Sequence, residues 1–383
     1  MTKRPTVGDT TFGRWLVSYE ASIVPAAMGP VAFGVAMLAS TGSAQTGAAL
    51  MAAMVVGQVS MAVPLEALTR GYRSKRILVL FLVIQATALA CLTVAIHARS
   101  PLPLLIVLAA VSGAPIGLAF SLFRYLLAQS SSRHMMVRRI AISLTVNEVC
   151  YIVCPIAASM VAGRYPLMPM LLMVGSVLAS AVLATRLVDP EPAGRQPSGN
   201  VFLRAVVPWL LSVFLSSAAL AFVEAGTVAI ALRIGWPAGV AGMIAAVSGL
   251  ASGVAGSYVA YRSPKATPEW VFALMAMTVA GVVLIAVSTT GGLVMLGSVV
   301  IGLGVAPLGT FLSVLIQDEI PESRLSAAMT LYRAAHGLGI GAAALLLALL
   351  TVPVTGVVIA VAVAVIGTGC AMAVYRRRRY QPQ

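Results

Sequence analysis

Charged side chains are scarce in this sequence. Asp, Glu, Lys and Arg together make up 9% of the 383 residues, whereas hydrophobic residues make up 60%. Soluble globular domains carry about 25% charged residues, and they could not hide this much apolar surface from water. The composition therefore excludes an ordinary soluble protein and indicates a chain that is solvated by lipid.

The sequence also lacks the patterns of common enzymes. It has no Gly-rich phosphate loop ending in Lys-Ser/Thr, so nucleotide hydrolysis is not the expected energy source. It has no His/Glu metal pattern and no Ser-centred nucleophile elbow. We expect no enzymatic activity, no cofactor and no metal site. The four cysteines show no disulfide framework and are predicted to be small core residues: Cys91, Cys150, Cys154 and Cys370.

Long apolar runs are what the chain has in abundance. A helix needs about 20 mostly apolar residues to cross a bilayer, and only helices or closed barrels satisfy their backbone there. The first run lacks the features of a cleaved signal peptide and should be retained. The runs predict an all-α membrane protein with twelve transmembrane helices, at about 15–39, 46–68, 77–97, 102–128, 139–163, 166–187, 203–232, 238–261, 269–289, 291–316, 324–350 and 353–375.

Positive charge is distributed unevenly between alternate loops. Only Arg99, Arg164 and Arg233 fall on one side of the predicted membrane, and nearly all other basic residues fall on the opposite side. Because basic loops stay in the cytoplasm, both termini are predicted to be cytoplasmic. The net charge of +14 then reflects topology and contact with anionic lipids, not nucleic acid. Arginine outnumbers lysine 22 to 3, which is typical of a GC-rich bacterial genome and indicates a bacterial cytoplasmic (inner) membrane.

The two halves of the chain resemble each other. We predict an N-terminal six-helix bundle at 1–188, a cytoplasmic linker at 189–202 and a C-terminal six-helix bundle at 203–383. Parallel repeats of this kind place a binding site between the halves near the membrane midplane. The alignment preserves the order of three matches: Gly47–Ala53 with Val240–Ala246, Gly113–Gly117 with Gly304–Gly309, and Arg139–Thr145 with Arg324–Thr330.

With this layout the chain resembles the major facilitator superfamily (MFS) over essentially its whole length. The loop Leu65–Arg76 is similar to the gating motif of that family, with Arg70, Arg73, Lys75 and Arg76 as its basic residues but without the family's Asp. Cys154–Gly163 resembles the family's Gly-Pro antiporter motif, with Cys in place of Gly. The resemblance implies a transporter, of efflux type, whose cytoplasmic latch differs from the family pattern.

Charges inside the predicted spans carry the functional signal, since each costs about 2.5–3.5 kcal/mol at mid-helix. By the repeat alignment, Glu148 and Arg333 occupy the same position, each roughly 13 Å from the cytoplasmic end of its helix. We expect them to face each other across the central cavity, either as a switchable charge pair or as a permanent salt bridge. Asn147 lies beside Glu148, and His336 lies one turn after Arg333. His336 is a candidate proton carrier, with a packing hydrogen bond as the alternative.

Two further acids are candidates for proton coupling or cation recognition. Glu20 lies in Tyr19–Ser22, a run similar to the first helix of some proton-driven multidrug antiporters; the alternative is an acid whose head lies in interfacial water. Glu224 lies deeper, between Phe222 and Gly226, with no basic neighbour in sequence. A structural hydrogen bond is the alternative for Glu224.

These features favour a secondary active transporter that exports a small amphipathic, cationic or zwitterionic organic compound in exchange for protons. The motivation is three embedded acids against one embedded arginine, in a cavity otherwise walled by Ala, Val, Leu and Met. Uptake of a small polar solute by a symporter or facilitator, lipid translocation, and a receptor or assembly partner that does not transport remain alternatives. The expected partners are a small-molecule substrate, protons or another coupling ion, and membrane lipids, with the protein acting as a monomer.

Overall fold

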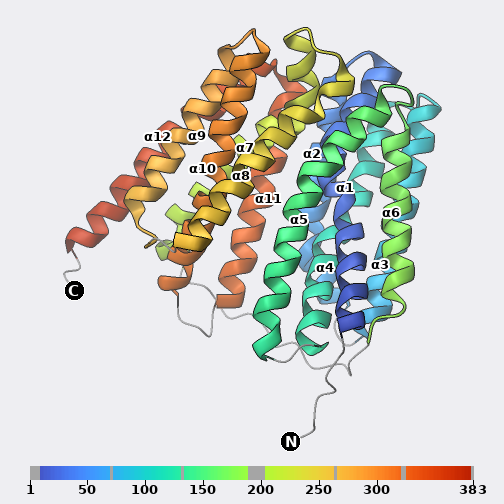
Figure 1. Ribbon diagram of the computed structural model, residues 1–383, viewed down its shortest axis with the longest axis horizontal. Coiled ribbons are helices and arrows are strands. Elements are labelled where there is room, and N and C mark those ends of the chain that lie inside the picture. The colour runs from blue at the N-terminus through green and yellow to red at the C-terminus, as the bar shows by residue number, and fades with distance from the viewer. Residues whose placement is uncertain are drawn as a thin grey trace, which may run out of the picture. The chain divides into compact units, whose positions relative to one another are not determined.

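The computed structural model describes residues 9–69, 72–130, 133–188, 203–262, 265–320 and 325–380. The chain divides into two compact units, Met1–Gln196 and Pro197–Gln383. The division falls inside the predicted linker 189–202, which lies outside the described residues. Figure 1 colours the first unit from blue to green and the second from yellow to red.

The described residues of each unit form six long helices joined by short connections. In the first unit these are α1 (Asp9–Thr41), α2 (Ala44–Leu68), α3 (Ser74–His97), α4 (Leu102–Ser130), α5 (Arg133–Ala162) and α6 (Met168–Ala184). In the second unit they are α7 (Leu203–Arg233), α8 (Gly242–Arg262), α9 (Pro268–Val287), α10 (Gly291–Asp318), α11 (Leu325–Leu349) and α12 (Val352–Tyr380), with the short 3-10 helix η1 (Ala238–Val240) before α8.

Each predicted span corresponds to one of these helices, so the predicted all-helical fold is confirmed. In the part of the chain that the structure describes, ten helices are long and apolar enough to cross a membrane. Within the described residues, the apolar stretches of the other two, at Val146–Ala162 and Met168–Ala184, are shorter. Several helices extend beyond the predicted spans, as α1 and α5 do at their starts, because polar residues continue a helix outside the hydrocarbon.

Glycine allows α2 and α4 to cross at backbone contact. A Cβ atom on Gly57 would collide with the carbonyl group of Ala110, and one on Gly113 with the carbonyl group of Met54. The second unit repeats this crossing between α8 and α10 with the glycine on α10, where Gly302 meets the carbonyl group of Ser248. Small residues provide such close approach in membranes, where packing rather than water exclusion holds helices together.

We expect Gly113→Ala to destabilise the first unit by about 1–3 kcal/mol, because the new methyl group can be accommodated only if α2 and α4 separate. Thermal unfolding of the purified protein in detergent measures the effect. The matched control is Gly175→Ala on α6, where an added Cβ has nothing within 4 Å. Equal melting temperatures for the two variants would contradict a tight α2–α4 crossing.

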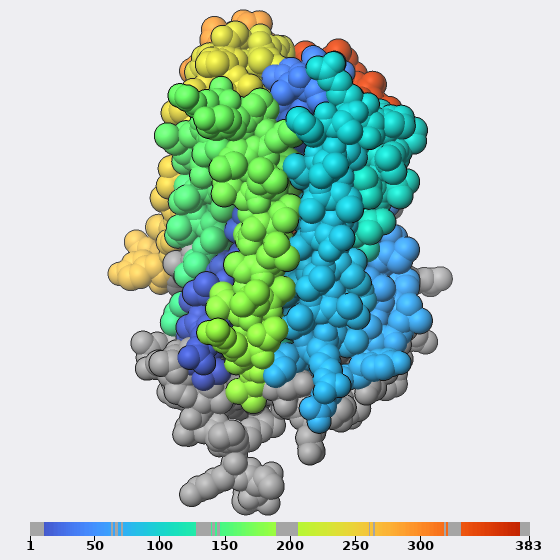
Figure 2. Space-filling view, turned by 90° about the vertical axis from the view of Figure 1, so that its right-hand side faces the viewer, coloured from blue at the N-terminus to red at the C-terminus, as the bar shows by residue number. Residues whose placement is uncertain are grey.

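The outward faces of the helices are apolar. Figure 2 shows one of them, on which α6 lies beside α3. Its exposed side chains include Leu171, Leu178 and Val182 of α6 and Leu80 and Val94 of α3. Apolar surface of this extent is unusual on a soluble protein and fits direct contact with lipid chains.

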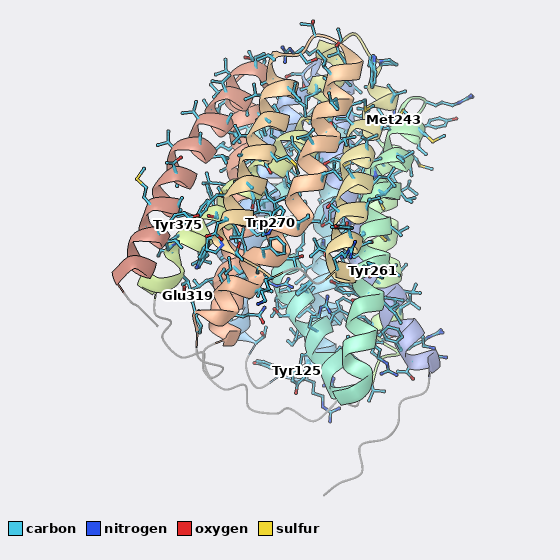
Figure 3. The ribbon with its side chains drawn as sticks, turned by 60° about the vertical axis from the view of Figure 1, so that its left-hand side comes forward. Tyr125, Met243, Tyr261, Trp270, Glu319 and Tyr375 are labelled. Atoms are coloured by element: carbon cyan, nitrogen blue, oxygen red, sulfur yellow. The ribbon has the colours of Figure 1, made fainter. Side chains whose placement is uncertain are left out.

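Exposed aromatic residues gather at one end of the second unit. Tyr261 near the end of α8, Trp270 in the first turn of α9 and Tyr375 near the end of α12 all point outward (Figure 3). The Tyr375 hydroxyl donates a hydrogen bond to Oε1 of Glu269, 3.2 Å away, and so links α12 to α9. Tyr and Trp collect where a membrane meets water, so this end marks an interface.

The prediction that all four cysteines are core residues is wrong for one of them. Cys370 is buried, Cys150 and Cys154 are half-buried, and Cys91 is exposed on α3. A spanning helix is apolar on its lipid-facing side as well as on its packed side, so an apolar neighbourhood in sequence does not indicate burial.

Candidate substrate and proton site

The candidate site in the first unit is built around α1, which packs against α2, α5 and α6. Two contacts fix α1. The Ser18 hydroxyl donates to the Ser180 carbonyl oxygen of α6 at 2.9 Å, and the Ser180 hydroxyl donates to the Ser18 carbonyl oxygen at 2.6 Å. Trp15 donates its indole N–H to the Phe123 carbonyl oxygen of α4 at 2.9 Å. Buried hydrogen bonds of this kind hold the rotation and depth of α1, and with them the direction of Glu20.

Glu20 is buried within the bundle, with 6% of its surface exposed. Among the described residues, neither of its carboxyl oxygens has a hydrogen-bond partner. The thiol of Cys150 on α5 is a neighbouring donor that does not reach the geometry of a formed hydrogen bond, and the guanidinium of Arg124 on α4 acts on the carboxyl through its charge. Burying an ionised carboxylate without a partner is costly, so a proton or a cation has to accompany this group. The alternative of an acid with its head in interfacial water does not fit this burial.

Aromatic rings surround the turn of α1 that precedes Glu20. Trp15 stacks on Tyr19, with ring centroids 5.0 Å apart. Phe120 and Phe123 of α4 both meet Tyr19 edge-on, at 5.9 Å and 5.6 Å. The Arg124 guanidinium lies over the rings of Tyr19 and Phe120, 5.4 Å and 5.3 Å from their centroids. A cation within about 6 Å of an aromatic face is attracted by the ring quadrupole, so α4 supplies Tyr19 with a cationic partner.

The predicted residues Asn147 and Glu148 belong to α5, which packs against α1. Asn147 is half-buried, whereas the Glu148 side chain is exposed. Cys150 and Cys154, one turn apart, interact through their thiols. The side chain of Thr145, one turn before Glu148, lies outside the described part of the chain.

In the second unit, α11 carries the predicted basic residues. The His336 ring nitrogen Nδ1 and the Ser217 hydroxyl of α7 form a hydrogen bond of 2.5 Å. His336 therefore has the packing hydrogen bond that was its alternative role, and the same bond fixes its ring. Arg333 is exposed one turn earlier, and the preceding Tyr332 donates to the Gly309 carbonyl oxygen of α10 at 3.3 Å. The Thr330 side chain lies outside the described residues.

Glu224 lies in the second half of α7 with its side chain half-buried. The carbonyl oxygen of Glu224 accepts a hydrogen bond from the Thr227 hydroxyl at 3.1 Å. Glu148 and Arg333 belong to different units, and their pairing stays a prediction.

The loop that resembles the gating motif lies between α2 and α3. Arg70 is outside the described residues. Arg73 immediately precedes α3 and is exposed, and Lys75 and Arg76 lie in the first turn of α3, which contains no acid. The one acid of the loop, Glu66, belongs to the last turns of α2, and its side chain lies outside the described part of the structure.

Sequence reasoning missed Cys150 as a neighbour of Glu20 and Phe120 as a neighbour of Tyr19, and it gave Arg124 no role there. One signal was available: Phe120 and Arg124 are four residues apart, as are Trp15 and Tyr19, so each pair shares a helix face. No sequence pattern within either helix indicates that the two faces contact each other.

Two units of long apolar helices define a multi-pass membrane protein, and the family to which it belongs is one of transporters. The chain belongs to the Major Facilitator Superfamily, whose family model matches residues 11–344. Its substrate is accordingly a small molecule. No curated protein matches the sequence.

Solved transporters share the fold at low sequence identity. The nucleoside transporter NupG has a TM-score of 0.74 and 11% identity, covering 95% of this chain and 98% of that chain. An auto-inhibited POT family peptide transporter has a TM-score of 0.77 and 9% identity, covering 98% of each chain. The human organic anion transporter MFSD10 has a TM-score of 0.66 and 14% identity, covering 97% of this chain and all of that one. At these identities the likeness concerns the fold alone.

Proposed function

We propose that this protein is a proton-coupled exporter of small amphipathic organic cations or zwitterions. The observation that carries the proposal is Glu20, a buried carboxyl in the first spanning helix without a hydrogen-bond partner among the described residues. Related folds are found in transporters named for nucleosides, peptides and organic anions, so the substrate class has to be inferred from side chains.

A single buried carboxyl can couple two flows when a proton and a cationic substrate compete for it. The group is then occupied by one or the other in each step of alternating access, and neither flow proceeds without the other. Aromatic rings beside Glu20 supply the apolar surface and the π faces that an amphipathic cation requires. Glu224 on α7 is a second candidate acid in the other unit, and its side chain is half-buried.

The proposed orientation follows from the loop charges. With the basic loops inside, both termini and the linker 189–202 lie in the cytoplasm of a bacterium, and the transporter acts in its inner membrane. Arg73, Lys75 and Arg76 then lie on the cytoplasmic side, where they would serve the gating loop together with Arg70. The loop lacks the family's Asp and has Glu66 as its one acid, so further groups that the basic residues contact in the closed state have to come from elsewhere in the chain.

Transport by the purified protein in liposomes tests the proposal. Vesicles with an acidic interior, placed in neutral buffer containing ethidium as a probe cation, should accumulate ethidium only when they contain the protein. Adding an ionophore that collapses the pH difference should release it. Accumulation that does not depend on the pH difference would make the protein a facilitator. A thermal-shift screen in which sugars but no cations stabilise the protein would favour the uptake alternative.

A further inference from the structure

One group of side chains between α1 and α4 contains a cation and an acid that are not joined to each other. We call this group, which consists of Tyr19, Glu20, Phe120 and Arg124, the α1–α4 cluster. The Arg124 guanidinium lies over two rings whose centroids are 5.9 Å apart and whose planes differ by 60°. It therefore occupies the angle between Tyr19 and Phe120. Because neither oxygen of Glu20 has a hydrogen-bond partner among the described residues, Arg124 acts on Glu20 only through its charge.

The Tyr19 ring of this cluster is held by rigid neighbours. Trp15 stacks on Tyr19 and is itself tied to the Phe123 carbonyl oxygen of α4. Trp15 also meets the Phe123 ring edge-on, with centroids 6.4 Å apart. The place of the Tyr19 ring beside α4 is thus set by contacts that do not involve Arg124. A preformed site of this kind loses little entropy when a ligand enters.

We propose that the α1–α4 cluster binds the organic cation and that Arg124 is its built-in competitor. The ligand is a planar cation such as a guanidinium or amidinium carrying an apolar group. It enters between Tyr19 and Phe120, pairs with Glu20 and displaces the Arg124 side chain. This inference rests on the proposed function, because it names the substrate class and the regulation of the site around Glu20.

The charges balance in this exchange. One guanidinium leaves the aromatic faces and another cation takes its place, so the positive charge over the two rings is unchanged. The ligand gains a charge-assisted hydrogen bond to Glu20, because a mobile cation can approach the carboxyl. The tethered Arg124 forms no hydrogen bond with it. Arg124 is only half-buried, so its head can move to water when it is displaced. When no substrate is bound, Arg124 keeps the rings occupied and excludes weakly binding cations.

Binding to the detergent-purified protein, without a gradient, tests this site. The probe is phenylguanidinium, and phenylurea is its neutral counterpart of the same shape. Trp15 is the single tryptophan of the first unit, so its fluorescence reports on Tyr19 once Trp209→Phe, Trp236→Phe and Trp270→Phe remove the others. We expect phenylguanidinium to bind saturably and phenylurea not to bind.

The decisive variants remove the competitor and the acid. Arg124→Gln, and Arg124→Met as a second variant that retains the apolar stem, should each bind phenylguanidinium about fivefold more tightly, because the rings are vacant. Glu20→Gln should bind it about tenfold more weakly. The matched control is Arg164→Gln: Arg164 also lies over an aromatic ring, that of Tyr165, at 5.6 Å, but it is exposed. Its affinity should equal that of the parent.

Unchanged or weaker binding in both Arg124 variants overturns the competitor role, and equal binding of phenylurea overturns cation recognition. The melting temperature of each unliganded variant identifies any that are misfolded, and Phe120→Leu, expected to weaken binding, tests the rings independently. Failure of this inference is distinguishable from failure of the proposed function. If ethidium transport persists but the variants bind phenylguanidinium as the parent does, only the role of the α1–α4 cluster is refuted. If the variants change binding as expected but no gradient-driven transport occurs, proton coupling is refuted.

Discussion

The double variant Glu20→Gln, Glu224→Gln should lose proton-driven transport, with ethidium accumulation falling more than tenfold to the level of protein-free liposomes. Glutamine keeps the size and polarity of each side chain but cannot take up or release a proton. Glu20 is the more heavily buried of the two, with 6% of its surface exposed, and we expect its single variant to show most of the loss. In alternating access the acid faces opposite sides of the membrane in successive states, and it carries a proton between them. Glutamine removes this proton transfer.

The control for this experiment is Glu319→Gln, an exposed acid at the end of α10. It removes one negative charge from the protein without touching a spanning segment, and its transport should match the parent. Full gradient-driven transport in the double variant would move coupling to Glu148 or His336. Wild-type transport that ignores pH altogether would contradict the antiporter assignment itself.

Reversing the charge at Glu148 or at Arg333 should abolish transport, and exchanging the two residues should restore part of it. Both side chains are exposed on helices that otherwise present apolar surface, and their positions correspond in the two repeats. A charge within a spanning helix is tolerated where it faces water or an opposite charge. Two like charges at these positions would repel in whichever state brings them together, whereas the exchanged pair would attract.

A double-mutant cycle measures this pairing. Initial transport rates of Glu148→Arg, Arg333→Glu and the exchanged pair give a coupling energy, which should exceed about 1 kcal/mol. Arg164→Glu, a reversal at an exposed turn between α5 and α6, serves as the control and should transport normally. If Glu148→Gln and Arg333→Ala each retain full activity, the two residues do not form a functional pair.

Sequence reasoning found Glu20 but not its surroundings. A short run of residues on α1 identified the acid, whereas its neighbours Arg124 and Cys150 come from α4 and α5, more than 100 positions away. His336 shows the same limit. Its partner Ser217 is 119 residues distant, and no local pattern on α11 announces a hydrogen bond to α7.

The sequence by itself determined that the protein is an all-helical membrane transporter of two six-helix halves. Each spanning helix must satisfy its own backbone in lipid, so a long apolar run is a nearly sufficient signal for it. Only the tertiary structure decided which side of each helix is packed, as exposed Cys91 and the glycine contact of Gly113 with Met54 illustrate. In lipid both sides of a helix are apolar, so hydrophobicity cannot distinguish them. The tertiary structure likewise decided that Arg124 meets two aromatic rings instead of the carboxyl oxygens of Glu20, because that choice depends on the rotation of α1 against α4.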